Sequence, residues 1–275
     1  MKNNDEKRGF SLNLLVPVIL GLIIVFSGYE LIQSLMSYKT ANDEYSELRE
    51  YVEVENYTNK ENEVETENNI EEESVVDFPV LDVDYQSLRA INEDYMGWIY
   101  IPALELSYPY VKGEDNEQYL HLTFEGKPSS SGTIFMDSYN YPNFRDFNTF
   151  LYAHNMKDKS MFGSLKLLGK DSSLVENEPY IYIYTPKASY QFKIFAYYVT
   201  RKGSDTYQIM LKPDEYDRYI EYIDGVNELS YSDDNDVIDF KEYPRILTLS
   251  TCQGSAGTSN RFVVHAALIN KIDRE

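Results

Sequence analysis

The chain has 275 residues, a net charge of −21 at pH 7 and 15% aromatic residues, which is enough length and apolar area for a sizeable core. The acidic balance argues against nucleic acid as a partner, because phosphate binding needs clustered Lys and Arg. The single cysteine, Cys252, rules out a disulfide within the chain. Its thiol is either a buried apolar group or a reactive one.

The first predicted element is a membrane-spanning helix. Phe10 to Tyr29 contain no charge over twenty residues, and about 20 helical residues cross a bilayer. Three basic residues precede this run and an acidic flank follows it, which predicts a cytoplasmic N-terminus and an extracellular remainder. No A-x-A-like cleavage site follows, which favours a retained anchor over a cleaved signal peptide. We therefore expect a cytoplasmic tail over 1–9, an anchor over 10–33, and a single-pass protein of the cell membrane.

An acidic extracellular spacer is predicted next, over residues 34–78. Between Ala41 and Ser74 there are thirteen acidic and two basic residues. The aliphatic residues are too few to offset the entropy lost on ordering the backbone. Glu44 to Val54 could still extend a helix out of the membrane. We expect the folded domain to cover residues 79–275.

From residue 79 onward, short apolar runs separated by Gly, Pro, Asn and Asp predict a compact, mostly β domain. Tyr180–Tyr184 and Tyr190–Tyr198 flank a turn and predict a hairpin. Arg245–Thr251 and Arg261–Ile269 are rich in β-branched residues and predict two strands joined by one loop. The number of such runs favours a closed or nearly closed barrel.

Few helices are expected around this barrel. Pro213 at a start, apolar residues at helical spacing and Gly225 as a stop predict one amphipathic helix. Asp84 to Asn92, with Asp84 as N-cap, and Met161 to Leu168 are two shorter candidates.

Cys252 ends a predicted strand and precedes a loop of small residues, Gln253 to Gly257. A thiol in this position can attack a carbonyl, and backbone amides that small residues leave uncovered can stabilise the oxyanion. A simple turn around a chemically inert cysteine would give the same local pattern.

A cysteine nucleophile needs a proton donor for the leaving amine, and His titrates closest to neutral pH. His154 ranks first because it lies where a strand-like run opens into a loop. His265 ranks second, on the same face of its strand as Arg261, and His121 is either packed or exposed. Arg261 follows the Cys252 loop, where its guanidinium can favour the thiolate or hold a carbonyl. No metal-binding pattern such as HExxH or CxxC is present, and we expect no metal and no cofactor.

Taken together, these segments resemble a known family. Thr248-Leu249-Ser250-Thr251-Cys252 followed by Arg261 resembles the TLxTC…R signature of sortases, and Tyr152-Ala153-His154-Asn155-Met156 resembles their histidine segment. The stretch from Asn92 to Pro102 looks like class B sortases in particular. The resemblance runs over roughly Val80 to Ile269.

The resemblance implies a mostly β fold: an eight-stranded sortase-type β-barrel with several peripheral helices, preceded by one N-terminal transmembrane helix. It implies a transpeptidase that cleaves a C-terminal sorting signal of secreted proteins after its Thr through a thioester on Cys252. The acyl group then passes to an amine of a peptidoglycan precursor or a pilin. Matching positions imply a signal groove, and its residues are Asn116, Leu120, Tyr152, Ser250 and Thr251, with Tyr219 and Ile220 as a far wall.

The loop from Gln253 to Asn260 departs from many class B members in its small and polar residues, and this departure concerns the choice of signal. Two other functions stay open from the sequence. One is an extracellular cysteine peptidase that uses the same residues with water as acceptor. The other is a non-enzymatic surface adhesin with an inert cysteine, which the order of His154, Cys252 and Arg261 disfavours.

Overall fold

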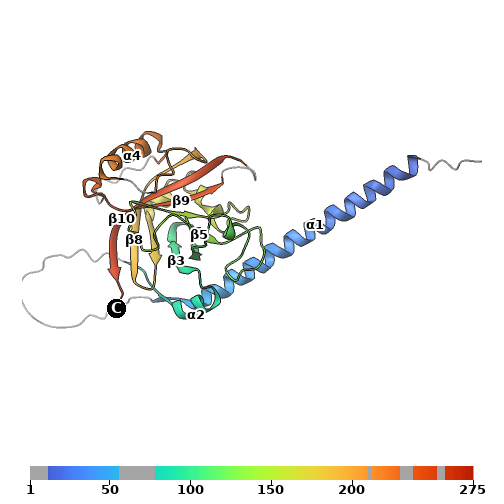
Figure 1. The fold of residues 1–275 in the computed structure, drawn as a ribbon, viewed down its shortest axis with the longest axis horizontal. Coiled ribbons are helices and arrows are strands. Elements are labelled where there is room, and N and C mark those ends of the chain that lie inside the picture. The colour runs from blue at the N-terminus through green and yellow to red at the C-terminus, as the bar shows by residue number, and fades with distance from the viewer. Residues whose placement is uncertain (1–11, 56–77, 210–211, 230–237, 253–257, 275) are drawn as a thin grey trace, which may run out of the picture.

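The computed structural model describes residues 12–55, 78–209, 212–229, 238–252 and 258–274. Most of them form one β-barrel, from which a long N-terminal helix, α1 (Leu12–Leu48), projects (Figure 1). The predicted cytoplasmic tail lies outside the described residues, as do residues 56–77 of the predicted spacer and the loop after Cys252 as far as Gly257.

Eight strands close the barrel in the order β10-β8-β7-β3-β4-β5-β6-β9, as predicted. The pairs β4–β5 and β6–β9 are parallel and the other neighbours are antiparallel. The barrel strands are β3 (Tyr95–Ile101), β4 (Leu106–Val111), β5 (Ile134–Met136), β6 (Asn148–Tyr152), β7 (Tyr180–Tyr184), β8 (Ala188–Arg201), β9 (Ile246–Cys252) and β10 (Asn260–Asp273).

Closure removes the free strand edges that would otherwise expose unpaired backbone groups. β8 and β10 have 14 residues each, and register shifts follow His265 and Leu268 in β10. Such bulges bend long strands and let them wrap around a barrel. Large aromatic side chains fill much of the interior. Trp98 is fully buried and donates its indole N–H to the hydroxyl of Ser107 at 2.9 Å, so its one polar group is satisfied.

Local sequence signals account for the remaining elements. The predicted hairpin is the pair β7–β8, and α2 (Tyr85–Ile91) begins at the predicted cap, where the Asp84 carboxylate accepts a hydrogen bond from the Ser87 N–H at 2.9 Å. α4 (Pro213–Val226) starts at Pro213 as predicted. The third predicted helix is a 3-10 helix instead. The further elements are α3 (Ser173–Asn177), α4 (Pro213–Val226), a ribbon of β1 (Val52–Glu55) with β2 (Val80–Val83), and 3-10 helices at Arg49–Tyr51, Pro102–Leu104, Gln118–Leu120, Phe162–Leu167 and Phe240–Glu242.

Packing on the barrel already involves residues ahead of 79, the predicted start of the folded domain. α1 continues to Leu48, and its last turns pack on the barrel through Ala41, Tyr45 and Leu48, each at most 2% exposed. These three residues follow helical spacing and form an apolar stripe. The acidic residues between them lowered the average hydrophobicity of the segment, which is why composition alone predicted a spacer. The folded domain therefore includes part of the segment from 34 to 55.

The N-terminal part of α1 carries apolar side chains that no other described residue covers, from Val16 to Met36. This helix is long and apolar enough to cross a membrane, which is consistent with membrane anchoring.

Gly97 in β3 is predicted to tolerate no side chain. A β-carbon there would collide with the carbonyl oxygen of Tyr184 in the neighbouring β7 and lie 2.9 Å from the ring of Tyr110. Gly97→Ala should therefore lower the free energy of unfolding by about 2 kcal/mol or more. Gly225→Ala in α4 is the matched control, because its methyl group meets nothing within 4 Å and helix propensity favours Ala by about 1 kcal/mol. Urea unfolding measures both, and equal effects would contradict the prediction.

Candidate active site

Two parallel neighbours, β6 and β9, bring distant parts of the chain to one mouth of the barrel. Their register pairs Tyr152 with Ser250, so the chain leaves both strands at the same level. His154 lies two residues beyond the end of β6, and Cys252 is the last residue of β9. Because parallel strands open toward the same edge, the histidine and cysteine segments lie next to each other.

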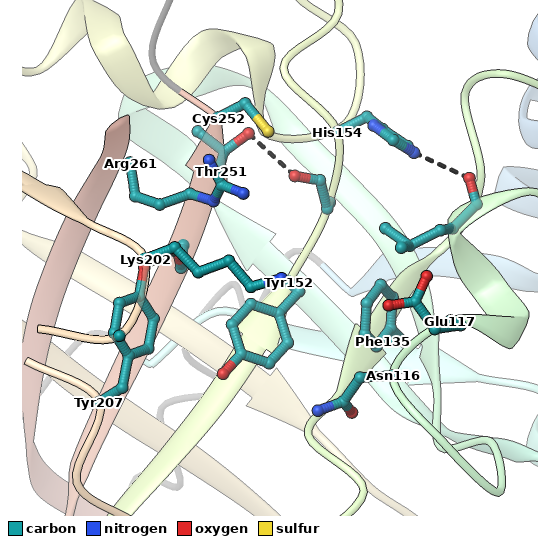
Figure 2. A pocket seen from close by; sticks show the side chains of 14 residues that line it. Asn116, Glu117, Phe135, Tyr152, His154, Lys202, Tyr207, Thr251, Cys252 and Arg261 are labelled. Atoms are coloured by element: carbon teal, nitrogen blue, oxygen red, sulfur yellow. Dashed lines mark hydrogen bonds between the residues drawn. The ribbon is translucent and has the colours of Figure 1, made fainter. Parts of the chain in front are cut away.

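A pocket of about 350 Å³ lies at this mouth and contains the three predicted catalytic side chains. Figure 2 shows the sulfur of Cys252 between the guanidinium of Arg261 and the ring of His154. Five of the predicted groove residues line the same pocket. They are Asn116, Leu120, Tyr152, Ser250 and Thr251, and the further lining residues are Glu117, Phe135, Ala153, Lys202, Gly203 and Tyr207.

Arg261 lies directly opposite Cys252 in the antiparallel pair of β9 and β10. Side chains opposite each other in such a pair point to the same face, about 5 Å apart at Cβ. The guanidinium Nη1 donates to the carbonyl oxygens of Thr258 at 2.7 Å and Asn260 at 2.9 Å. These bonds hold the cation at the pocket, while Cys252 is partly exposed there. A permanent positive charge thus faces the thiol.

The ring of His154 is oriented by one hydrogen bond, from Nε2 to the carbonyl oxygen of Leu120 at 2.8 Å. A carbonyl oxygen only accepts, so Nε2 carries the proton. Nδ1 then has no partner within the part of the chain that the structure describes, and it is available for proton exchange. The His121 ring lies 6.3 Å away, centroid to centroid.

The groove residues are fixed by hydrogen bonds to one another and to the chain behind them. Thr251 donates to the carbonyl of Ala153 at 2.8 Å, which ties the cysteine strand to the histidine segment. The hydroxyl of Tyr152 donates to Asp137 at 2.9 Å. Burial and then the Asp137 charge raise the pKa of Tyr152, so this tyrosine remains a neutral donor. Asn116 donates to the same carboxylate at 3.1 Å.

Tyr219 and Ile220 do not reach the pocket. Tyr219 is a residue of α4 and is buried on the side of the helix that faces the barrel. Its hydroxyl donates to the carbonyl of Thr206 at 2.7 Å and accepts from Asn148 at 2.8 Å. Ile220 lines a different cavity, beneath α4 and beside Phe240. The amphipathic pattern of α4 buries one face of the helix against the barrel, so these two residues pack between the helix and the barrel.

Tyr207 occupies the wall that Tyr219 and Ile220 were expected to form. It comes from the loop after β8, and its hydroxyl is 3.0 Å from that of Ser250. Lys202 lies at the start of the same loop. Sequence analysis missed both residues, although the pairing of Arg201 with Asn260 places this loop beside Arg261. That pairing would have identified Lys202 and Tyr207 as pocket residues. It could not be used, because the sequence does not show that β8 and β10 are neighbours.

His265, the second-ranked histidine, is fully buried and lies away from the pocket. Thr248 donates its hydroxyl proton to Asn148 at 2.7 Å, so it accepts from Nδ1–H of His265 at 2.8 Å. The other ring nitrogen then accepts from the hydroxyl of Tyr198 at 3.0 Å. Both nitrogens are engaged, and the ring is a structural part of the barrel rather than a proton donor at the site.

Comparison with known proteins shows which family the chain matches. The family model described as the sortase domain matches residues 99–269. Sortase B of Listeria monocytogenes is 35% identical over 190 residues, which cover 68% of this chain and 75% of that protein.

Solved structures agree with the sequence match. The Staphylococcus aureus sortase B-substrate complex has a TM-score of 0.60 and 31% identity, over 67% of this chain and 84% of that one. A structure of sortase B complexed with triglycine has a TM-score of 0.60 and 30% identity, over 70% and 86% of the two chains.

The buried His265 predicts a pH dependence of stability. Burial lowers the pKa of His265 to about 3, whereas an unfolded histidine titrates at about 6.5. Below that pH the unfolded state binds a proton that the folded state does not, so stability falls as the pH drops toward 3. Between pH 7 and pH 5 the loss should be about 2 kcal/mol. Urea unfolding at both pH values measures it. His265→Gln should lack this contribution, and identical pH slopes in the two proteins would contradict the assignment.

Proposed function

This chain belongs to the sortase family, as a cysteine transpeptidase of class B, and from that premise we propose that Cys252, His154 and Arg261 carry its reaction. The observation that carries the proposal is the convergence of a partly exposed thiol, an oriented imidazole and a cross-strand guanidinium on one pocket. The proposed substrates are secreted proteins that bear a C-terminal sorting signal.

Cys252 is the proposed nucleophile. Its thiolate attacks the carbonyl carbon of the Thr in the signal, and the C–N bond to the next residue breaks as the tetrahedral intermediate collapses. The proton lost by the thiol is held on Nδ1 of His154, which makes the ring an imidazolium, and Nδ1 gives that proton to the leaving amine. The product is a thioester between the Thr carbonyl and the sulfur.

The second half of the reaction resolves the thioester. An incoming amine of a peptidoglycan precursor or a pilin attacks the thioester carbonyl, and the C–S bond breaks to release the thiolate. His154, now neutral at Nδ1, accepts the proton that the incoming amine loses. The bond from Nε2 to Leu120 supports this role, because it holds the ring while leaving Nδ1 to exchange protons.

Arg261 is the proposed electrostatic stabiliser. Its position opposite Cys252 puts a charge that does not titrate beside the carbon under attack. Negative charge develops on the Thr carbonyl oxygen in the tetrahedral intermediate, and a preorganised cation lowers the energy of that state. Among the described residues, the bonds to Thr258 and Asn260 use only Nη1, which leaves the other guanidinium nitrogens for the substrate.

The groove proposed for the signal consists of the pocket wall formed by Asn116, Leu120, Tyr152, Ser250 and Thr251. We add Tyr207, because its ring faces the same space and its hydroxyl lies beside that of Ser250. The substrate complex of the S. aureus relative supports a substrate site in this fold, and the relative complexed with triglycine supports a peptide amine as acceptor.

The proposed topology has residues 1–9 in the cytoplasm, the N-terminal part of α1 in the membrane and the barrel outside the cell. The basic residues ahead of the apolar run and the acidic residues after it support this orientation. Secreted substrates and cell-wall amines are on that side.

A cysteine peptidase that only hydrolyses is the alternative mechanism, since the same three residues would serve with water as the acceptor. The adhesin hypothesis is disfavoured, because Cys252 is partly exposed at a pocket rather than buried.

Replacing the nucleophile should abolish cleavage. Cys252→Ala removes the sulfur without adding bulk, and kcat/KM for a fluorogenic signal peptide should fall by at least about 10³-fold. The wild-type protein should gain the mass of the acyl fragment on Cys252 when quenched with acid during turnover. Cleavage retained by Cys252→Ala would remove this cysteine from the mechanism.

The nature of the acceptor separates transpeptidase from hydrolase. With the signal peptide and triglycine, the ligated product should replace most of the hydrolysis product as the amine concentration rises, because the thioester is shared between amine and water. Mass spectrometry of both products measures the ratio. A ratio that does not respond to triglycine or to a diaminopimelate peptide would favour the hydrolase.

A further inference from the structure

The carbonyl that orients His154 belongs to a loop that the N-terminal helix holds in place. The loop runs from residue 119 to residue 133, and Leu120 near its start accepts the hydrogen bond from Nε2 of His154 at 2.8 Å. α1 packs against the same loop from the outside, through its last turns (Figure 1). The helix that carries the apolar N-terminal run therefore contacts the loop that positions the proposed proton donor.

The two ends of loop 119–133 lie against each other. The N–H of Thr133 donates to the carbonyl of Tyr119 at 3.0 Å. Gly132 has a φ of +58°, and a β-carbon there would lie 2.6 Å from the carbonyl oxygen of Tyr119 and 2.9 Å from that of Leu120. The backbone of Gly132 thus lies against the carbonyl that His154 uses, with no room for a side chain between them.

Tyr45 of α1 fixes the position of Gly132. Its hydroxyl donates to the Gly132 carbonyl at 2.7 Å and lies 3.1 Å from the hydroxyl of Thr133. The Tyr45 side chain is 2% exposed. Burial raises the pKa of Tyr45 well above its ordinary value, so the hydroxyl stays a donor at any physiological pH.

Glu44 fixes the middle of the same loop. Its side chain is 3% exposed, and its carboxylate accepts from the hydroxyl of Thr123 at 2.8 Å and from the N–H of Glu125 at 2.9 Å. The ammonium group of Lys127 lies 3.6 Å away. A buried carboxylate is tolerated only when donors surround it. All of the donors found for Glu44 come from this loop, so helix and loop depend on each other.

We propose that Glu44 and Tyr45 are positioning residues for catalysis: through loop 119–133 they fix the carbonyl of Leu120, and through that carbonyl they fix the ring of His154. Neither residue touches the pocket, so neither is catalytic. The path from Tyr45 to His154 consists of one hydrogen bond, the packing of Gly132 on Leu120, and a second hydrogen bond. This inference rests on the proposed role of His154.

The test uses the full-length protein in detergent micelles, with Tyr45→Phe as the main variant. This change removes one hydroxyl and keeps the ring packed. We expect kcat for the signal peptide to fall about tenfold, because a small displacement of a catalytic group slows the chemical step strongly. KM should stay within twofold. Glu44→Gln, which turns an amide N–H₂ toward the loop donors, should have the same effect and serves as a second variant.

Tyr216→Phe is the matched control. The Tyr216 hydroxyl also donates to a backbone carbonyl, that of Pro244, at 2.7 Å, but under α4 and away from the pocket. It should lower the melting temperature about as much as Tyr45→Phe and leave kcat within twofold. A similar loss of kcat in both variants would show that general stability explains the effect and would overturn the proposal.

A direct readout is the tautomer of His154 in ¹⁵N-histidine NMR spectra at alkaline pH. The wild-type protein should show the proton on Nε2, Tyr45→Phe should show a mixture of both tautomers, and Tyr216→Phe should resemble the wild type. Unchanged His154 signals in Tyr45→Phe overturn the proposal even if kcat falls. This readout does not need substrate, so a wild-type protein without cleavage activity would refute the proposed function while the spectra still decide the positioning role.

Discussion

The parallel pairing of β6 with β9 is the constraint on which the site depends. It aligns Tyr152 with Ser250 and so brings the segments that follow, one with His154 and one with Cys252, to one mouth of the barrel. The antiparallel pairing of β9 with β10 then puts Arg261 opposite Cys252. Side chains alternate along a strand, so a slip of one residue in either pairing would turn the thiol away from the other two groups. Barrel closure makes such a slip costly.

Behind the pocket, a hydrogen-bonded network between the outer face of the barrel and α4 makes this register specific. Thr248, two residues before Ser250 on the same face of β9, joins the ring of His265 to the side chain of Asn148. Asn148 begins β6, and it also donates to the hydroxyl of Tyr219 under α4. Satisfied buried polar groups favour one arrangement of strands, because any other leaves donors unpaired. One face of β9 thus contains Thr248, which stabilises the strand arrangement, and Cys252, which lies in the pocket.

Much of the fold and the centre of the site could be predicted from the sequence, because both depend on local patterns. Strands, turns and the cap of α2 follow from short-range signals, and the order of His154, Cys252 and Arg261 carries the family resemblance. The differences between prediction and structure involve tertiary contacts. Tyr219 matches a groove residue by position only, and helical spacing does not say which side of α4 faces the barrel. Tyr207 enters the site because β8 neighbours β10, a pairing between segments far apart in sequence.

The continuity of α1 has a consequence for where the barrel can work. A helix of 37 residues is about 55 Å long at 1.5 Å per residue. With Phe10 to Tyr29 in the bilayer as proposed, roughly seven helical residues separate the lipid surface from Ser37 and Tyr38, where contact with the barrel domain begins. These residues form a helical stalk about 10 Å long. The helix then holds the pocket at a fixed distance from the lipid surface. Substrates can therefore react only within a thin layer of the envelope next to the membrane.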